Sequence, residues 1–113
     1  MKSPRLSVLA VLLLVGLIGC SSNSRPTVRV RNERATKANV QFKDASGNTT
    51  NINDVSGGST SAYSDVDAGA YTVTAGIQNE GVAPTATFTA LGDERYTVVV
   101  LTGTTPALRV DRP

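Results

Sequence analysis

A single cysteine, Cys20, carries the clearest chemical signal in this chain. Its thiolate is a nucleophile, and it follows the small residue Gly19 at the end of an apolar run, residues 6–18, that Lys2 and Arg5 precede. Cations, a short apolar segment and a small residue are the parts of a secretory signal peptide and its cleavage site. The run is too short to span a bilayer, because crossing ~30 Å of hydrocarbon takes about 20 helical residues. We therefore expect cleavage directly before Cys20.

Leu17-Ile18-Gly19-Cys20 resembles the lipobox of bacterial lipoproteins, in which diacylglycerol is attached to the cysteine sulfur before the peptide is cut. The resemblance implies a lipidated Cys20 bearing palmitate-like chains, and Ser21 at the second mature position implies the outer membrane where the cell has one. Each buried methylene contributes about 0.8 kcal/mol, so two or three chains would anchor the protein firmly. An ordinary signal peptide with an accidental cysteine and an uncleaved anchor are the alternatives.

The expected organisation is a signal peptide over residues 1–19, a lipidated cysteine and polar tether over 20–26, and one domain over 27–113. Cleavage would leave 94 of the 113 residues, which suffices for one modest core. The mature chain would carry 9 basic and 9 acidic residues, since Lys2 and Arg5 leave with the signal peptide. Nucleic-acid binding needs clustered excess positive charge, so we do not expect that class of partner.

The charges are nevertheless segregated along the chain. Residues 25–43 hold six bases and one acid, whereas residues 44–94 hold no base. One interpretation is that the basic early strands lie beside acidic later segments and neutralise them. These segments carry Asp65, Asp67, Asp93 and Glu94. The other is a face that binds an anionic surface, either lipid head groups or an acidic polymer. The candidate residues for that face are Arg29, Arg31 and Lys43.

Apolar and polar residues alternate with a period of two along most of the remaining chain, which is typical of strands with one solvated face. Turns rich in Gly, Asn and Asp separate the runs. Residues 95–102 are apolar on both faces and should be central in a sheet. The pattern predicts an all-β fold, an antiparallel β-sandwich of seven or eight strands, immunoglobulin-like or prealbumin-like. The expected strands are residues 27–32, 38–43, 49–55, 60–66, 70–78, 85–91, 95–102 and 107–111.

The turn Asp67-Ala68-Gly69-Ala70-Tyr71 resembles a tyrosine corner, in which a buried tyrosine bonds backbone through its hydroxyl. We expect Gly69 to permit a close approach between strands. Together with the runs 28–32, 58–63, 66–73 and 95–100, this turn is similar to a family of small bacterial extracellular β domains known only as a domain of unknown function. The Gly-x-Tyr turn is also similar to one in prealbumin-like modules, and neither resemblance implies a catalytic residue.

All five aromatic residues fall inside expected strands, so we expect them to pack in the core. They are Phe42, Tyr63, Tyr71, Phe88 and Tyr96. The sequence lacks tryptophan, the residue preferred for stacking on sugars, and this absence weakens the case for an aromatic sugar-binding platform.

The sequence contains no histidine, so imidazole catalysis and histidine metal ligation are not available. A Ser-Lys pair using Lys37 or Lys43 lacks the apolar surroundings that would activate the amine. Calcium needs six to eight oxygens, and no loop has the spacing to supply them. The candidate calcium ligands are the side chains of Asp65 and Asp67, together with that of Asn51 or Asp54. We expect no enzyme activity, no cofactor, no metal and no small-molecule substrate.

The sequence predicts a lipid-anchored, non-enzymatic protein of the cell envelope that acts as a structural or interaction module. The alternative is an accessory binding module for an exopolysaccharide or another envelope polymer, using Arg29, Arg31 and Lys43. The expected partners are the membrane, through the lipid anchor, and an envelope protein or polysaccharide. An unpaired edge strand could also receive a strand from another chain.

Overall fold

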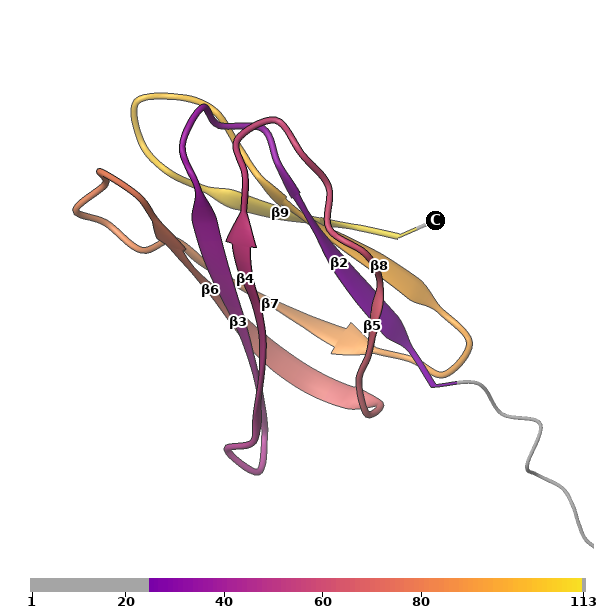
Figure 1. Cartoon of the computed structure of the whole chain (residues 1–113). Coiled ribbons are helices and arrows are strands. Elements are labelled where there is room, and N and C mark those ends of the chain that lie inside the picture. Colours follow the sequence, from indigo (N-terminus) through magenta and orange to yellow (C-terminus); the bar gives the residue numbers. More distant parts are fainter. Residues whose placement is uncertain (1–24, 113) are drawn as a thin grey trace, which may run out of the picture.

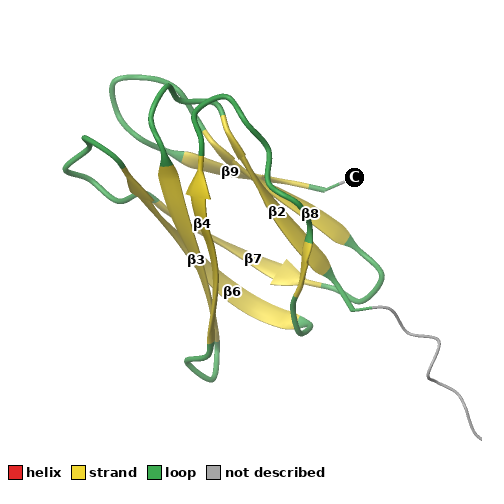
Figure 2. Cartoon of the chain, viewed as in Figure 1, coloured by secondary structure: helices red, strands yellow, loops and turns green. Residues whose placement is uncertain are grey.

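Two four-stranded sheets lie face to face in the part of the chain that the computed structural model describes, residues 25–112 (Figures 1 and 2). The first sheet has the order β5-β2-β8-β9 and the second the order β4-β3-β6-β7. The predicted β-sandwich is confirmed. The strands are β2 (Thr27–Asn32), β3 (Ala38–Asp44), β4 (Thr49–Val55), β5 (Ser64–Asp65), β6 (Gly69–Ile77), β7 (Thr85–Ala90), β8 (Arg95–Val100) and β9 (Leu108–Asp111). Over the same residues, no helix is long and apolar enough to cross a membrane.

The first sheet departs from a fully antiparallel arrangement at its centre. β2 runs parallel to β8, with Thr27 opposite Arg95 and Asn32 opposite Val100, whereas the other strand pairs of residues 25–112 are antiparallel. Parallel neighbours cannot be joined by a hairpin. The chain between them instead builds the whole second sheet and the edge strand β5 (Figure 1). The expected central position of β8 is confirmed, since it lies between β2 and β9.

The core lies between the sheets, because alternate residues of each strand point inward. Phe88 of β7 contacts three other aromatic rings, at centroid distances of 5.7 Å to Tyr71, 6.4 Å to Phe42 and 5.0 Å to Tyr96. These four rings come from both sheets and join them, as expected for core aromatics. Valine supplies much of the rest of the buried core, as Val28, Val30, Val40, Val55, Val66, Val73, Val98 and Val100.

A bulge in β4 explains why this strand has a weak alternating pattern. Ile52 and Val55 are both buried although they are three residues apart, because the pairing with β3 shifts register between Ala38 and Val40. Asp54 takes the extra position with a φ of 59°, and its N–H donates to Oδ1 of Asn39 at 2.7 Å. The bulge therefore turns both apolar side chains toward the core.

The strand predicted over residues 60–66 is mostly absent. β5 covers only Ser64–Asp65, and Thr60 makes one isolated bridge to Arg31. Ser61 accounts for part of the difference, since its Oγ accepts the Val30 N–H at 2.9 Å in place of a backbone carbonyl. A side chain that replaces a ladder partner leaves no repeating strand pattern. Tyr63 consequently lies outside any strand and is 38% exposed, so its expected place in the core is wrong.

The tyrosine corner forms as its sequence indicates. Tyr71 is 5% exposed, and its hydroxyl donates to the Asp67 carbonyl at 2.7 Å. Burial, followed by the negative charges of Asp44 and Asp67, raises the pKa of Tyr71 above its ordinary value of 10.0. The expected reason for Gly69 is wrong, because nothing lies within 4 Å of where a Cβ would stand. The glycine is needed for its φ of 142°, a conformation that other residues rarely adopt.

One buried side chain, Asn32, ties the two sheets together at the end of β2. It is 0% exposed, and its Nδ2 donates to the carbonyls of Thr36 at 2.6 Å and Val55 at 3.0 Å. Its Oδ1 accepts the Arg34 N–H at 3.0 Å. Both ends of the amide are thus satisfied, which offsets the cost of burying it. Nearby, Gly57 permits a close approach between two loops, since a Cβ there would stand 2.4 Å from the Ala35 carbonyl oxygen.

Candidate anion-binding face

Arginine side chains occupy the outer face of the first sheet. Val28 and Val30 are buried, so Arg29 and Arg31 between them point outward from β2. Two rows cross the sheet at these positions. In the register, Arg29 lies beside Thr97 and Asp111, and Arg31 lies beside Val99 and Arg109. Arg95 at the start of β8 lies opposite Thr27. We call this surface the arginine face and define it by Arg29, Arg31, Arg95, Arg109 and Arg112.

The exposed Tyr63 organises two of these guanidinium groups. The Arg29 Cζ lies 4.6 Å from the centroid of the Tyr63 ring, and the Arg95 Cζ lies 5.6 Å from it. Both distances are within the reach of a cation–π interaction. Arg29 is further fixed by a bond from its Nε to Thr97 Oγ1 at 3.0 Å. The positive charges of Arg29 and Arg95 are therefore held near one aromatic ring, and these contacts use only part of the N–H donors of the two guanidinium groups.

Many other bases of the described chain have carboxylate partners. Arg25 pairs with Asp67 at 2.9 Å, Arg34 with Glu80 at 2.7 Å, and Lys37 with Asp54 at 3.5 Å. These three pairs join the basic early segment to later acids, as the neutralising interpretation predicts. On the arginine face, Arg31 pairs with Glu33 and Arg109 with Asp111.

Three guanidinium groups of the arginine face make no ion pair with any residue of the described range 25–112, those of Arg29, Arg95 and Arg112. The neutralising interpretation therefore accounts for only part of the charge.

These three arginines line one hollow of about 290 Å³. The hollow also includes Val99, which is 1% exposed although it lies on the outward side of the central strand. Asp111 stands in the same hollow, with Oδ1 2.8 Å from Arg109 Nε and Oδ2 3.0 Å from Arg109 Nη2. This hydrogen bond lowers the pKa of Asp111, so its carboxyl stays ionised and accepts further donors.

The structure brings together two of the three predicted binding residues and separates the third. Lys43 points outward from β3, because Phe42 beside it is buried, and β3 belongs to the second sheet. It therefore lies on the opposite outer surface of the sandwich from Arg29 and Arg31. The reason is the period of a strand: the sequence shows which residues point outward but not which sheet carries them.

Sequence reasoning missed Arg95, Arg109 and Arg112 as members of the arginine face, and Tyr63 as the ring beside it. The three arginines follow the long stretch without bases, so the segregation of charge along the chain points to earlier residues. The parallel pairing of β2 with β8 brings Arg95 beside the early bases. A pattern of local alternation contains no signal for such a contact.

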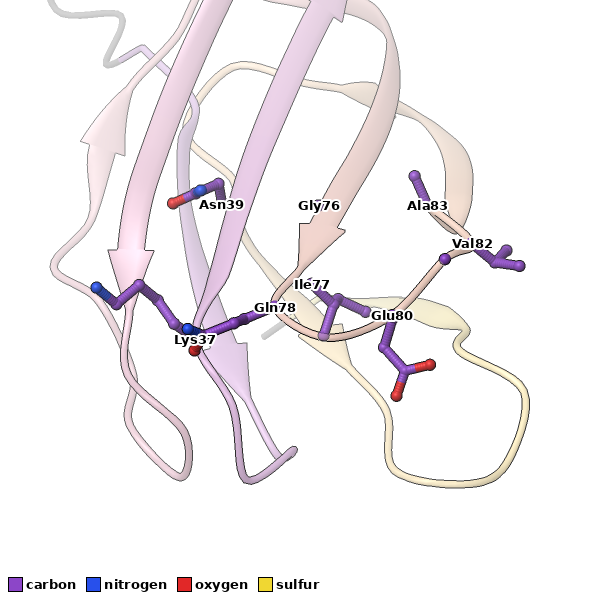
Figure 3. Close-up of a pocket in the computed structure, with 9 residues that line it drawn as sticks. Lys37, Asn39, Gly76, Ile77, Gln78, Glu80, Val82 and Ala83 are labelled. Atoms are coloured by element: carbon purple, nitrogen blue, oxygen red, sulfur yellow. The ribbon is translucent and has the colours of Figure 1, made fainter.

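A second hollow, of about 410 Å³, lies where β3 and β6 meet the loop of residues 78–84 (Figure 3). Its two charged residues are already engaged, Lys37 with Asp54 and Glu80 with Arg34. The remaining lining is amide and small apolar side chains, including the 59% exposed Val82. This hollow offers neither a free charge nor a nucleophile.

Within residues 25–112, no group of three or more His, Cys, Asp or Glu side chains could hold a metal ion. The expected lipidation site, Cys20, lies outside the described residues, as do the expected signal peptide and most of the tether. The last tether residues do belong to the sandwich, because Pro26 is buried and its carbonyl accepts the Val66 N–H at 3.0 Å.

Comparison with known proteins supports the fold class and goes no further. No protein-family model matches the chain, and no curated protein sequence matches it. Among solved structures, the chain is similar to an NMR structure of a protein from Eubacterium rectale, with a TM-score of 0.57 and 16% sequence identity. The match covers 82% of this chain and 92% of that one. At this identity the similarity shows a shared fold alone.

Proposed function

We propose that this chain is a lipid-anchored, non-enzymatic module of the cell envelope that binds an anionic partner through its arginine face. One observation carries the proposal. Three guanidinium groups line one hollow and have no carboxylate partner within residues 25–112, and they belong to Arg29, Arg95 and Arg112. Guanidinium groups bind carboxylates and phosphates through paired, charge-assisted hydrogen bonds. Of the two functions expected from the sequence, this hollow favours binding over a purely structural role.

The anchor rests on the resemblance of Leu17-Ile18-Gly19-Cys20 to a lipobox. Replacement Cys20→Ser removes the sulfur that would carry the lipid. We expect the native protein to remain in the membrane pellet after a salt wash and the variant to leave it, since two or three acyl chains hold a protein far more firmly than one. Mass spectrometry of the native amino terminus supplies the second readout. An unmodified Cys20, or an intact Met1, would contradict the anchor.

Binding by the arginine face is tested by retention of the full chain, in a neutral detergent, on immobilised heparin. Replacements Arg95→Gln and Lys43→Gln each remove one positive charge, but Lys43 lies on the opposite sheet. We expect Arg95→Gln to elute at clearly lower salt than the native chain and Lys43→Gln to elute close to it. Equal shifts for the two variants would mean that retention follows net charge, and the proposed face would be wrong.

A further inference from the structure

The hollow of the arginine face combines groups that a purely electrostatic surface does not need. Guanidinium groups at Arg29, Arg95 and Arg112 can grip an anion, and the carboxylate of Asp111 can only accept hydrogen bonds. Thr97 adds a hydroxyl group, and Tyr63, which is 38% exposed, adds a partly exposed aromatic ring. From this combination we infer that the hollow binds an acidic sugar, a uronic-acid unit of an envelope polysaccharide. The inference rests on the proposed function and specifies its ligand.

A sugar acid fits each of these groups. Its planar carboxylate matches the fork of a guanidinium group such as Arg95, which makes two parallel hydrogen bonds to one carboxylate. Its ring hydroxyls can donate to Asp111, whose oxygens keep free lone pairs beside their bonds to Arg109. Its C–H face can lie against the exposed part of the Tyr63 ring. The volume of about 290 Å³ is at the small end of ligand pockets, about 300–1,000 Å³, and suits one or two sugar rings.

The same groups disfavour two other kinds of anionic partner, a ligand with a higher charge and the flat surface of an anionic bilayer. Asp111 stands inside the hollow and would repel a doubly charged phosphate monoester more strongly than a singly charged carboxylate. Attachment to an anionic bilayer gains about 1 kcal/mol for each base near its surface. On this face Glu33 and Asp111 offset Arg31 and Arg109, and Lys43 lies on the other sheet. The chemistry therefore favours a singly charged ligand that is rich in hydroxyl groups.

The test uses the full chain in a neutral detergent and oligogalacturonate as the probe, with binding followed by calorimetry and by backbone NMR shifts. We expect binding that moves signals of β2, β8 and β9 and that weakens as salt is added. The fully methyl-esterified oligomer keeps the hydroxyls but loses the charge, and it should bind at least about tenfold more weakly, the effect of about one charge-assisted hydrogen bond. Equal binding of the ester would overturn the inference.

Two variants and a control assign the ligand to the hollow. Arg95→Gln should weaken binding of oligogalacturonate on the order of ten- to a hundredfold, the range for one guanidinium–carboxylate contact. Asp111→Asn should also weaken it, because the amide presents one acceptor oxygen to the ring hydroxyls where the carboxylate presents two. Since this replacement makes the hollow more positive, a gain in affinity would contradict the role of Asp111 as the hydroxyl acceptor. Lys43→Gln should bind as the native chain does. Melting curves of all three variants establish that they are folded.

Two further probes separate the inference from the function on which it rests. Inorganic phosphate and glycerophosphoglycerol, the soluble head group of an anionic phospholipid, present phosphate chemistry without a sugar carboxylate. Tighter binding of either one than of oligogalacturonate, lost in Arg95→Gln, would overturn the acidic-sugar ligand but leave an anion-binding arginine face in place. Absence of binding to every anion would overturn both.

Discussion

The buried amide of Asn32 allows a sharp test of how the sandwich is held together. Asn32→Asp keeps the shape of the side chain but removes both N–H donors, so the carbonyls of Thr36 and Val55 lose their partner at 2.6 and 3.0 Å. Each buried polar group left unpaired costs about 1–3 kcal/mol. A neutral carboxyl group can still donate to one carbonyl. At pH 4 we therefore expect a loss of about 2 kcal/mol in the free energy of unfolding.

The loss should grow as the pH rises. Burial and two facing carbonyls disfavour the carboxylate, so the pKa of the introduced carboxyl group in the folded state lies above its unfolded value of about 3.9. Stability from such a raised pKa is present below the unfolded value and is lost as the pH increases, by up to about 1.4 kcal/mol per unit. We expect a total loss of at least about 4 kcal/mol at pH 7.

Urea unfolding followed by circular dichroism, with native chain and variant compared at each pH, measures this loss. The matched control is Asn51→Asp, the same replacement at an exposed position of β4, which should change stability by less than about 0.5 kcal/mol. An equal loss for Asn32→Asp at pH 4 and pH 7, or a loss below about 1 kcal/mol at pH 7, would refute the proposed role of this side chain.

Two further replacements test other contacts of the fold. Gly57→Ala would place a Cβ 2.4 Å from the Ala35 carbonyl oxygen, so we expect a loss of about 2 kcal/mol in urea unfolding; Gly81→Ala, where nothing lies within 4 Å, is its control and should be nearly neutral. Tyr71→Phe removes the bond to the Asp67 carbonyl and should cost about 1 kcal/mol at pH 7. Because burial raises the pKa of Tyr71, the native chain should lose stability above pH 10.0 more steeply than this variant, as unfolding at a series of alkaline pH values would show. Parallel curves would contradict that assignment.

The elements of this fold were predictable because they depend on neighbouring residues. Alternation in the sequence predicts β2 and β4 with the bounds observed, and the turn before Tyr71 predicts its buried ring and backbone hydrogen bond. The bulge at Asp54 was harder to predict from the sequence, since two buried residues three positions apart interrupt the alternation of apolar and polar residues. β5 was overpredicted because Ser61 supplies a side-chain partner that no alternation rule anticipates.

The candidate site was harder to predict because it depends on which strands become neighbours. Alternation predicts that Arg29, Arg31 and Lys43 all point outward, but it does not indicate that Lys43 belongs to the other sheet. Arg95 and Arg29 lie near the same Tyr63 ring only because β8 pairs in parallel with β2. The aromatic character of their common partner, Tyr63, predicts a place in the core. The side chain is exposed because the expected strand over residues 60–66 is reduced to Ser64–Asp65 and leaves Tyr63 outside it.

The central parallel pair has a consequence for the order in which the molecule assembles. Arg29 and Thr97, 68 positions apart, are adjacent in the finished sheet, so β2 cannot acquire this neighbour until β8 has been synthesised. The hydrogen-bonded pairs of the second sheet, in contrast, involve only β3, β4, β6 and β7, all of which end by Ala90. Contacts that close long loops form slowly. Among the strands of residues 25–112, β2 comes first in the chain and is nevertheless among the last to gain all its neighbours, so the arginine face forms only after β8 and β9 have been made.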